Sequence, residues 1–105
     1  ELAQAYPQVK MVVTHCAQLD ISGLSIGDAM ILAQETEQVY FETSGVYRRD
    51  LIEGLVNDVG AHRLVFGSNF PDMNIEMELE RIYAADLPDE AKAQLLGENA
   101  RGIFK

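Results

Sequence analysis

Three short apolar runs divide the chain at regular intervals. They lie at residues 10–15 (KMVVTH), 38–43 (QVYFET) and 62–67 (HRLVFG), and each is rich in β-branched or aromatic side chains. Short apolar runs between polar or glycine-containing segments are typical of buried β-strands. The pattern therefore predicts a strand at each of these positions.

The segments between and after the runs have helical spacing. Apolar residues recur at steps of three and four, as Ile26, Met30 and Ala33 and again as Leu51, Leu55 and Val59. Ser25 is the expected N-cap of the first helix, and Gly60 the glycine that follows the second. Further helices are expected at about 75–86 and 89–96, with a final turn near 98–104, because Pro88-Asp89-Glu90 is a typical helix start.

The resulting order is βαβαβα, which favours an α/β fold with parallel strands joined by helical crossovers. The strands should be adjacent and in sequential order. Residues 1–105 contain no linker-like or low-complexity segment, so we interpret them as a single domain segment.

A sheet of only three parallel strands would have two open edges, and parallel sheets are normally covered on both faces. The chain also begins at Glu1, without a methionine, in what reads as the end of a helix. We therefore expect either a remnant of a longer barrel or open sheet, or a homo-oligomer whose copies cover the edges. Without such cover, four inward side chains should be exposed: Met11, Val13, Tyr40 and Val65.

The amino-acid composition argues against two classes of binding partner, nucleic acids and membranes. The chain has 17 acidic and 8 basic side chains, a net charge of -9, so phosphate backbones and anionic lipid are disfavoured. The acidic residues are dispersed over the expected helices, as on an ordinary solvated surface. A single cysteine, Cys16, excludes an internal disulfide and fits a reducing compartment, so we expect a cytoplasmic protein without nucleic-acid or membrane partners.

His15 closes the first expected strand at its C-terminal end, where α/β proteins usually place their chemistry. Strand alternation puts His15 on the face of Met11 and Val13, and Cys16 on the opposite face. Adjacent strand residues diverge, so a Cys16–His15 nucleophile–base pair is not expected. We interpret Cys16 as a small buried hydrophobic residue.

The other two strands also end in polar residues. Glu42 and Ser44 share one face, from which both can face the mouth of the sheet, although Glu42 can equally cap a neighbouring loop. Gly45 then gives the backbone freedom to turn. Asn69 follows the third run, and because an amide neither accepts a proton at neutral pH nor carries charge, it is an unusual residue for a catalytic position.

Four motifs resemble the last part of one enzyme family: VVTHCA at 12–17, VYFETSG at 39–45, GAHRLVFGSNFP at 60–71 and LLGENARGIF at 95–104. In this order they are similar to the last three βα units of the amidohydrolase superfamily. The nearest branch is that related to aminocarboxymuconate semialdehyde decarboxylase, also described as amidohydrolase 2. The resemblance covers nearly the whole chain and implies a (β/α)8 TIM barrel with a divalent metal, commonly zinc, at its C-terminal mouth.

The resemblance also implies roles for particular residues. His15 matches a histidine beside the metal that activates water or holds the substrate, and Asn69 matches an aspartate that touches the metal. Ser44 and Glu42 are the expected substrate-binding residues, with Ser44 matching a Ser-Gly pair that shapes the mouth. Asn99 matches an asparagine that ties the last helix. The family's His-x-His ligand pair is absent from the sequence, so His15 and Asn69 give at best a weak, incomplete metal site.

Asn69 is where the sequence departs from the family pattern. Loss of a catalytic base commonly removes about 10²–10⁴ in rate. Asp72 would restore a carboxylate if its turn folded back, although Pro71 restricts that turn. The resemblance thus predicts part of a metal-dependent hydrolase or decarboxylase for a small carboxylic acid, lactone or amide, with residues 1–105 inactive alone and holding no metal tightly. The alternative is a catalytically silent homologue or a structural module.

Overall fold

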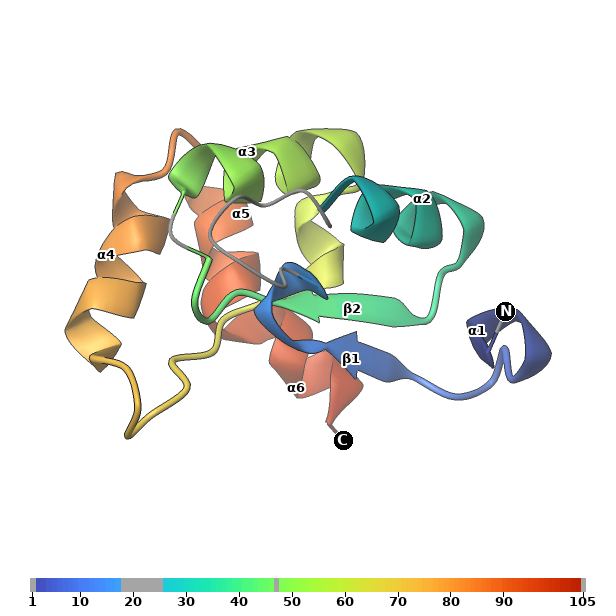
Figure 1. Ribbon diagram of the computed structural model, residues 1–105. Coiled ribbons are helices and arrows are strands. Elements are labelled where there is room, and N and C mark those ends of the chain that lie inside the picture. The colour runs from blue at the N-terminus through green and yellow to red at the C-terminus, as the bar shows by residue number, and fades with distance from the viewer. Residues whose placement is uncertain (1, 18–25, 47, 105) are drawn as a thin grey trace.

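A computed structural model describes residues 2–17, 26–46 and 48–104 of the protein (Figure 1). Short 3₁₀ turns are labelled η1 and η2, and a π-helical segment η3. The elements follow in the order α1 (Leu2–Ala5), β1 (Met11–Val13), η1 (Thr14–Ala17), α2 (Ile26–Glu35), β2 (Val39–Glu42), α3 (Arg49–Asp58), η2 (Ala61–Arg63), β3 (Leu64–Val65), α4 (Ile75–Ala84), α5 (Asp89–Ala93), η3 (Gln94–Glu98) and α6 (Asn99–Ile103).

The strands form a parallel sheet in the order β1-β2-β3. Val12 pairs with Tyr40 in β2, and Glu42 pairs with Val65 in β3. The predicted parallel, adjacent and sequential arrangement is confirmed. Consecutive strands that run the same way need a crossover, and the crossovers here are α2 and the α3–η2 stretch.

The strands are shorter than the apolar runs predicted, and this corrects the placement of His15. β1 ends at Val13, and the next turn holds His15 and Cys16 in left-handed conformations with φ of 55° and 49°. Side chains alternate between faces only while the backbone stays extended. The alternation argument for these two residues is therefore wrong.

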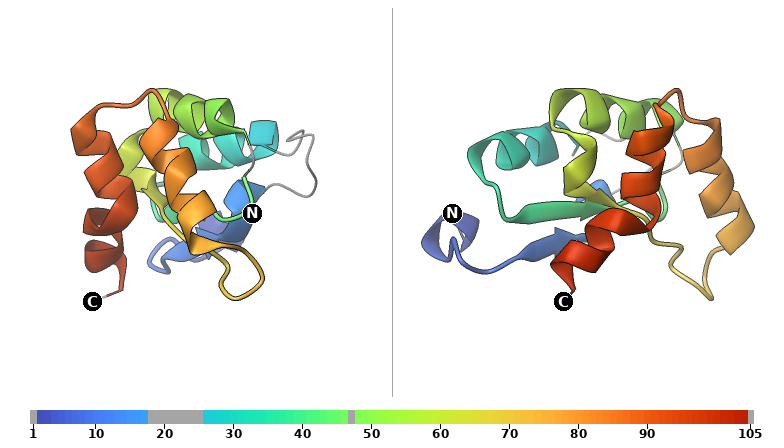
Figure 2. Two further views of the ribbon diagram at one scale, coloured as in Figure 1. Left: turned by 90° about the vertical axis from the view of Figure 1, so that its left-hand side faces the viewer. Right: turned by 180° about the vertical axis from the view of Figure 1, so that it is seen from behind.

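Helices cover the sheet and close the core. α2 and α3 lie along one side of it, while the α5–η3–α6 stretch runs beside β3 (Figures 1 and 2). The largest fully buried side chains come from β2, α3, β3, α4 and η3: Phe41, Ile52, Leu55, Leu64, Ile82 and Leu95. Fully burying such a side chain contributes roughly 1.5–3 kcal/mol. Helices from three parts of the chain thus depend on one core.

The helix boundaries follow local sequence signals. Asn74 caps α4, because its Oδ1 accepts a hydrogen bond from Met77 N at 3.2 Å. α5 starts directly after Pro88 as predicted, but the helical path continues through η3 and α6 to Ile103 rather than stopping near residue 96. Gly60 has φ of 117° and follows the end of α3. The predicted N-cap, Ser25, lies outside the described residues.

Two polar side chains fasten β3 to its surroundings, and we call them the Arg63–Asn99 clamp. Arg63 is buried and donates from Nε to Val39 O at 2.7 Å and from Nη1 to Ala33 O at 3.1 Å. Asn99 donates from Nδ2 to Ala61 O at 2.6 Å and to Leu64 O at 2.7 Å. The prediction that Asn99 ties the last helix is confirmed.

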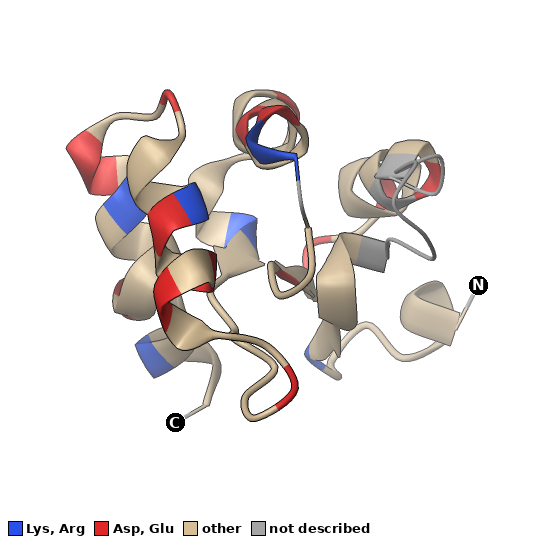
Figure 3. Cartoon of the chain, turned by 60° about the vertical axis from the view of Figure 1, so that its left-hand side comes forward, with Lys and Arg blue, Asp and Glu red and all other residues tan. Residues whose placement is uncertain are grey.

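The surface bears its acidic residues on several helices rather than in one cluster (Figure 3). Arg48 and Arg49 are exposed, and Arg48 forms an exposed ion pair with Asp50. Among the described residues, no helix is long and apolar enough to cross a membrane. The expected dispersed, solvated charge is confirmed.

The four residues expected to point inward do not share one face of the sheet. Val12 pairs with Tyr40 and Glu42 pairs with Val65, so Tyr40 and Val65 lie on the face opposite Met11 and Val13. Met11, Val13 and Tyr40 are half-buried. Val65 is buried, with 3% of its surface exposed, so its predicted exposure is wrong. The side that carries β1 and α1 is therefore the less covered part of the sheet.

Candidate functional site

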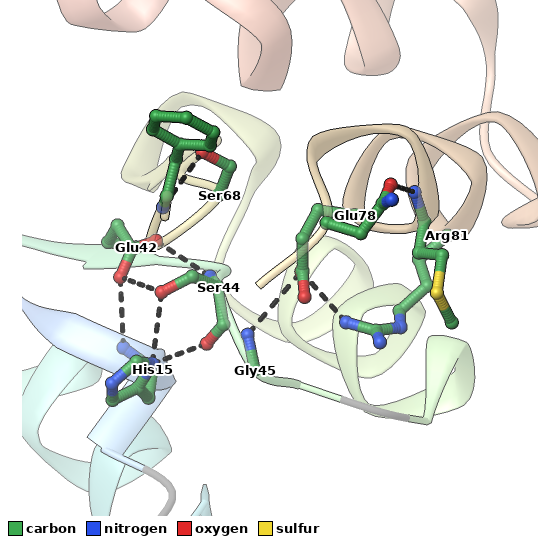
Figure 4. A network of polar contacts seen from close by, with 10 residues as sticks. His15, Glu42, Ser44, Gly45, Ser68, Glu78 and Arg81 are labelled. Carbon is green, nitrogen blue, oxygen red and sulfur yellow. Dashed lines mark hydrogen bonds and ion pairs between the residues drawn. The ribbon is translucent and has the colours of Figure 1, made fainter. Parts of the chain in front are cut away.

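Polar residues meet at the C-terminal ends of β1 and β2. His15 follows β1 by two residues, Glu42 is the last residue of β2, and Ser44 comes two residues later. Parallel strands bring their carboxyl ends to one edge of a sheet, so residues 27 positions apart in sequence come into contact. We call His15, Glu42 and Ser44 the strand-end cluster (Figure 4).

Glu42 is the acceptor at the centre of the strand-end cluster. Its Oε1 accepts a hydrogen bond from Ser44 N at 2.7 Å. Its Oε2 accepts from Ser44 Oγ at 2.9 Å and from His15 N at 3.2 Å. One carboxylate therefore satisfies two backbone N–H groups and a hydroxyl.

The His15 ring is oriented by Ser44. Its Nδ1 lies 2.6 Å from Ser44 O and 3.0 Å from Ser44 Oγ. A carbonyl oxygen only accepts, and the Ser44 hydroxyl directs its one proton to Glu42, so Nδ1 must carry the ring proton. In the neutral ring the lone pair is then on Nε2, which forms no hydrogen bond with the described part of the chain.

The backbone around the cluster is held in an uncommon conformation. His15 and Cys16 are consecutive left-handed residues that are not glycine, and this conformation costs roughly 1–2 kcal/mol per residue. Gly45 has φ of 74°, and a Cβ there would lie 3.2 Å from His15 Nδ1. A glycine at position 45 therefore serves both the turn and the close approach of the ring.

Gly67 provides the space that Glu42 occupies. A Cβ built at position 67 would overlap the Glu42 carboxylate, with Oε1 the nearest atom. Only hydrogen at this position lets the carboxylate lie across the neighbouring strand end. The sequence signal for this contact is the glycine directly after the third apolar run, but its partner is fixed by the tertiary structure.

A second carboxylate, Glu78 of α4, anchors the loop after Ser44. Glu78 is 3% exposed, accepts from Gly45 N at 3.4 Å and forms an ion pair with Arg81 Nη1 at 2.8 Å. Sequence reasoning missed this residue, because it lies among other acidic residues of the first helical turn. Its spacing of three from Arg81 was the one available signal.

Cys16, the residue after His15, is fully buried, as predicted. Burial, with a smaller contribution from the negative charge of Glu42, raises the pKa of its thiol to about 12. A thiol with such a pKa is protonated at neutral pH and is a poor nucleophile. The interpretation of Cys16 as a small buried residue is confirmed.

Asn69 is not part of the cluster. It is exposed and left-handed, with φ of 53°, and its carbonyl accepts from Asp72 N at 3.0 Å and Met73 N at 3.3 Å. Within the described ranges its side chain forms no hydrogen bond with His15, Glu42 or Ser44. The structure thus brings three of the four predicted site residues together and leaves Asn69 on the surface at the same end of the sheet.

The described residues do not form a metal site by themselves. Across 2–17, 26–46 and 48–104 there is no group of three or more His, Cys, Asp or Glu side chains placed to hold an ion. Catalytic zinc usually takes three protein ligands. His15 Nε2 is a suitable single donor, since ligating histidines commonly donate their other ring N–H to a carbonyl, as Nδ1 does here.

The largest hollow described lies at the other end of the strands. It has a volume of about 720 Å³ and is lined by residues before β1 and β2, such as Lys10 and Gln38, and by the end of α2. Barrel enzymes place their chemistry at the C-terminal ends of the strands. The strand-end cluster, and not the larger hollow, therefore lies where barrel enzymes place their chemistry.

Comparison with known proteins supports a single assignment of fold. A family model described as amidohydrolase matches residues 1–105. No curated protein matches the chain significantly.

Solved structures align with 98% of the length of this chain. They include 5-carboxyvanillate decarboxylase from Sphingomonas paucimobilis (20% identity, TM-score 0.74, 36% of that chain). A dihydroxybenzoic acid decarboxylase from Polaromonas with bound manganese (18%, 0.73, 36%) and a putative 2-pyrone-4,6-dicarboxylic acid hydrolase from Pseudomonas putida (22%, 0.69, 46%) also match. The chain therefore spans less than half the length of these relatives, and its βα units are those of the last part of a TIM barrel.

Proposed function

Because the chain belongs to the amidohydrolase family, we propose that it forms the C-terminal part of a metal-dependent decarboxylase or hydrolase. The substrate class is a small carboxylic acid, with a lactone or amide as further members. Support comes from the structurally similar proteins, which are decarboxylases of aromatic acids and a putative hydrolase of a pyrone dicarboxylic acid. A divalent metal is part of this proposal, with zinc implied by the resemblance and manganese bound in the Polaromonas protein.

The orientation of His15 is the observation that carries the proposal. Its Nδ1 proton is held by Ser44 O, so Nε2 presents a lone pair at the strand end where barrel enzymes work. An imidazole held in this way can accept a proton at Nε2 or a hydrogen bond from a substrate acid. Ser44 and Glu42, the residues expected to bind substrate, have hydrogen-bond partners within the protein.

His15 Nε2 is the candidate metal ligand among the described residues, with Asn69 as a weak second, and further ligands would come from elsewhere in the full-length protein. When bound, the metal would polarise an oxygen of the substrate. Residues 1–105 alone should show no hydrolase or decarboxylase activity and should lose added zinc on dialysis against a mild chelator. Zinc retained at one equivalent per chain would contradict this view of the site.

Replacing His15 by Asn in the full-length protein tests the proposal. With aromatic carboxylates as substrates and manganese or zinc supplied, we expect turnover to fall by about 10²–10⁴-fold, the usual contribution of a general acid or base. The exposed His62 lies before β3, at the other end of the strands, so His62→Asn is the matched control and should leave turnover unchanged. Equal activity in the two variants would exclude His15 from the chemistry.

Asn69 supports the second candidate, a catalytically silent homologue, because it stands where the family resemblance implies an acid. Asn69→Asp in the full-length protein should raise metal affinity or turnover if position 69 reaches the metal. Asn57→Asp, an equal charge change at an exposed residue of α3, is the control. If neither quantity changes, Asn69 lies outside the metal's ligand sphere.

We propose that the half-buried side of β1 is covered by additional protein in the working molecule, either a longer chain or another copy. Met11 and Val13 lie on this edge strand, and exposed strand edges favour pairing. Sedimentation of the 105-residue polypeptide tests this, and self-association is expected. A compact monomer with a cooperative unfolding transition would overturn it.

A further inference from the structure

We propose that Glu42 is a positioning residue, which fixes the His15 ring and its proton through Ser44 and does not bind substrate. The inference rests on the proposed function and deepens it, since it names what holds the candidate acid–base group. Its support is a set of hydrogen bonds and one close approach, all within the described residues.

The carboxylate of Glu42 is committed to the protein. It accepts three hydrogen bonds, from Ser44 N, Ser44 Oγ and His15 N. A carboxylate has about four lone-pair sites, so little acceptor capacity remains for a substrate. A carboxylate at this edge would also repel an anionic substrate, whereas it suits the backbone N–H groups that surround it.

The same three bonds determine how the ring is held. The bond from His15 N reaches the backbone of the left-handed turn, and the bonds from Ser44 fix the segment whose carbonyl accepts from Nδ1. Because the Ser44 hydroxyl proton is directed to Glu42, only acceptors face Nδ1. Glu42 therefore favours the ring form with the proton on Nδ1 and the lone pair on Nε2.

Gly67 shows that this position of the carboxylate is built into the fold. A side chain at position 67 would occupy the same space as Glu42 Oε1. Gly67 does not have a positive φ, so alanine is compatible with its backbone. Gly67→Ala should therefore displace the flexible end of Glu42 and leave the strand in place.

The test is the tautomer of His15, measured by ¹⁵N NMR of imidazole-labelled protein at a pH where the ring is neutral. The wild type should show the Nδ1–H form at His15. The exposed His62 serves as an internal reference and should show mainly the Nε2–H form that is preferred in water. Neither substrate nor metal is present, so this result is independent of the proposed function.

Glu42→Gln and Gly67→Ala should both shift His15 toward the Nε2–H form. In the first variant, the side-chain amide cannot accept from both backbone N–H groups and the hydroxyl at once. In the second, the added methyl group moves the carboxylate without removing its charge. Glu53→Gln is the matched control, because the Glu53 carboxylate accepts from a backbone N–H group, that of Asp86, and not from the cluster. It should leave the His15 signals unchanged.

Two results would overturn the proposal. One is a wild-type His15 in the Nε2–H form. The other is a variant, either Glu42→Gln or Gly67→Ala, whose amide spectrum shows that it is folded and whose His15 ring signals are the same as in the wild type. In the full-length protein, Glu42→Gln should lower kcat by about 10–100-fold with KM little changed, as loss of orientation does. A rise in KM alone would instead identify Glu42 as a substrate ligand.

Discussion

The strand-end cluster and the Arg63–Asn99 clamp both place polar side chains in the interior, but they work in opposite senses. In the cluster, the Glu42 carboxylate accepts hydrogen bonds from backbone N–H groups of Ser44 and His15. In the clamp, Arg63 and Asn99 donate to backbone carbonyls of the surrounding elements. Each arrangement satisfies backbone groups that regular secondary structure leaves unpaired.

The cluster and the clamp differ in whether a proton-accepting atom is left without a hydrogen-bond partner among the described residues. The cluster leaves the Nε2 lone pair of His15 without a partner in the described chain, and it maintains left-handed backbone that is costly without support. The clamp joins α2, β2, η2 and β3 through four donor bonds and has no proton-accepting group. We infer that the cluster serves chemistry and the clamp stability.

The largest expected effect is on the clamp. Arg63→Met should lower the free energy of unfolding by about 2–4 kcal/mol, because the carbonyls of Ala33 and Val39 lose their donors inside the protein. Urea titration measures this. Arg63→Lys keeps the charge but not the planar guanidinium group. Its free energy of unfolding should lie between those of the wild type and Arg63→Met. A loss below about 1 kcal/mol in Arg63→Met would mean that water replaces the guanidinium.

Asn99→Ala should cost about 1–3 kcal/mol in the same titration, since two carbonyl oxygens, of Ala61 and Leu64, lose one shared donor group. Asn57→Ala, at an exposed position of α3, is the control and should have little effect. The His15 tautomer should be unchanged in Asn99→Ala. A changed tautomer would show that the clamp and the cluster are coupled.

Cys16 makes stability at the cluster end depend on pH. Its thiol pKa is raised from 9.0 to about 12 in the folded protein, so the folded state keeps the proton where the unfolded chain releases it. The contribution of the protonated Cys16 thiol to the free energy of unfolding is complete below pH 9.0. It is lost as the pH rises toward about 12, at up to about 1.4 kcal/mol per pH unit. Urea titration of the wild type and Cys16→Ala from neutral to alkaline pH measures this contribution, as the difference between their free energies of unfolding. A difference independent of pH would contradict the raised pKa.

The smallest effect is expected at Arg48. Its ion pair with Asp50 is exposed to solvent on both sides. Solvent screens exposed ion pairs, so Arg48→Ala should leave the free energy of unfolding almost unchanged. Unfolding at low and high salt checks this, and a larger, salt-sensitive loss would show that the pair belongs to the structural core.

The architecture could be predicted from the sequence because its signals are local. Apolar runs placed β1, β2 and β3, and three- and four-residue spacing placed α2 and α3. Pro88 marked the start of α5, although nothing local indicated that the helix would continue through η3 to Ile103. The motifs around His15 and Ser44 indicated the amidohydrolase family, to which the chain belongs.

The candidate site was predicted only in part. His15, Glu42 and Ser44 were chosen because they end strands, and the structure joins them. The alternation argument for His15 does not apply, since β1 ends two residues before it and the backbone there is left-handed. Glu78 was missed because its neighbours in α4 are equally acidic, and its spacing of three from Arg81 did not reveal that it is buried.

The sequence by itself determined which elements form, their order and the polar residues that end the strands, because propensity and hydrophobic periodicity act over a few residues. Only the tertiary structure decided that Glu42 meets His15 across 27 positions, lies against Gly67 and directs the ring proton to Nδ1. Such contacts depend on the register between strands and on where each strand ends. A register shift of one residue between β1 and β2 would turn Glu42, the strand residue among them, away from His15.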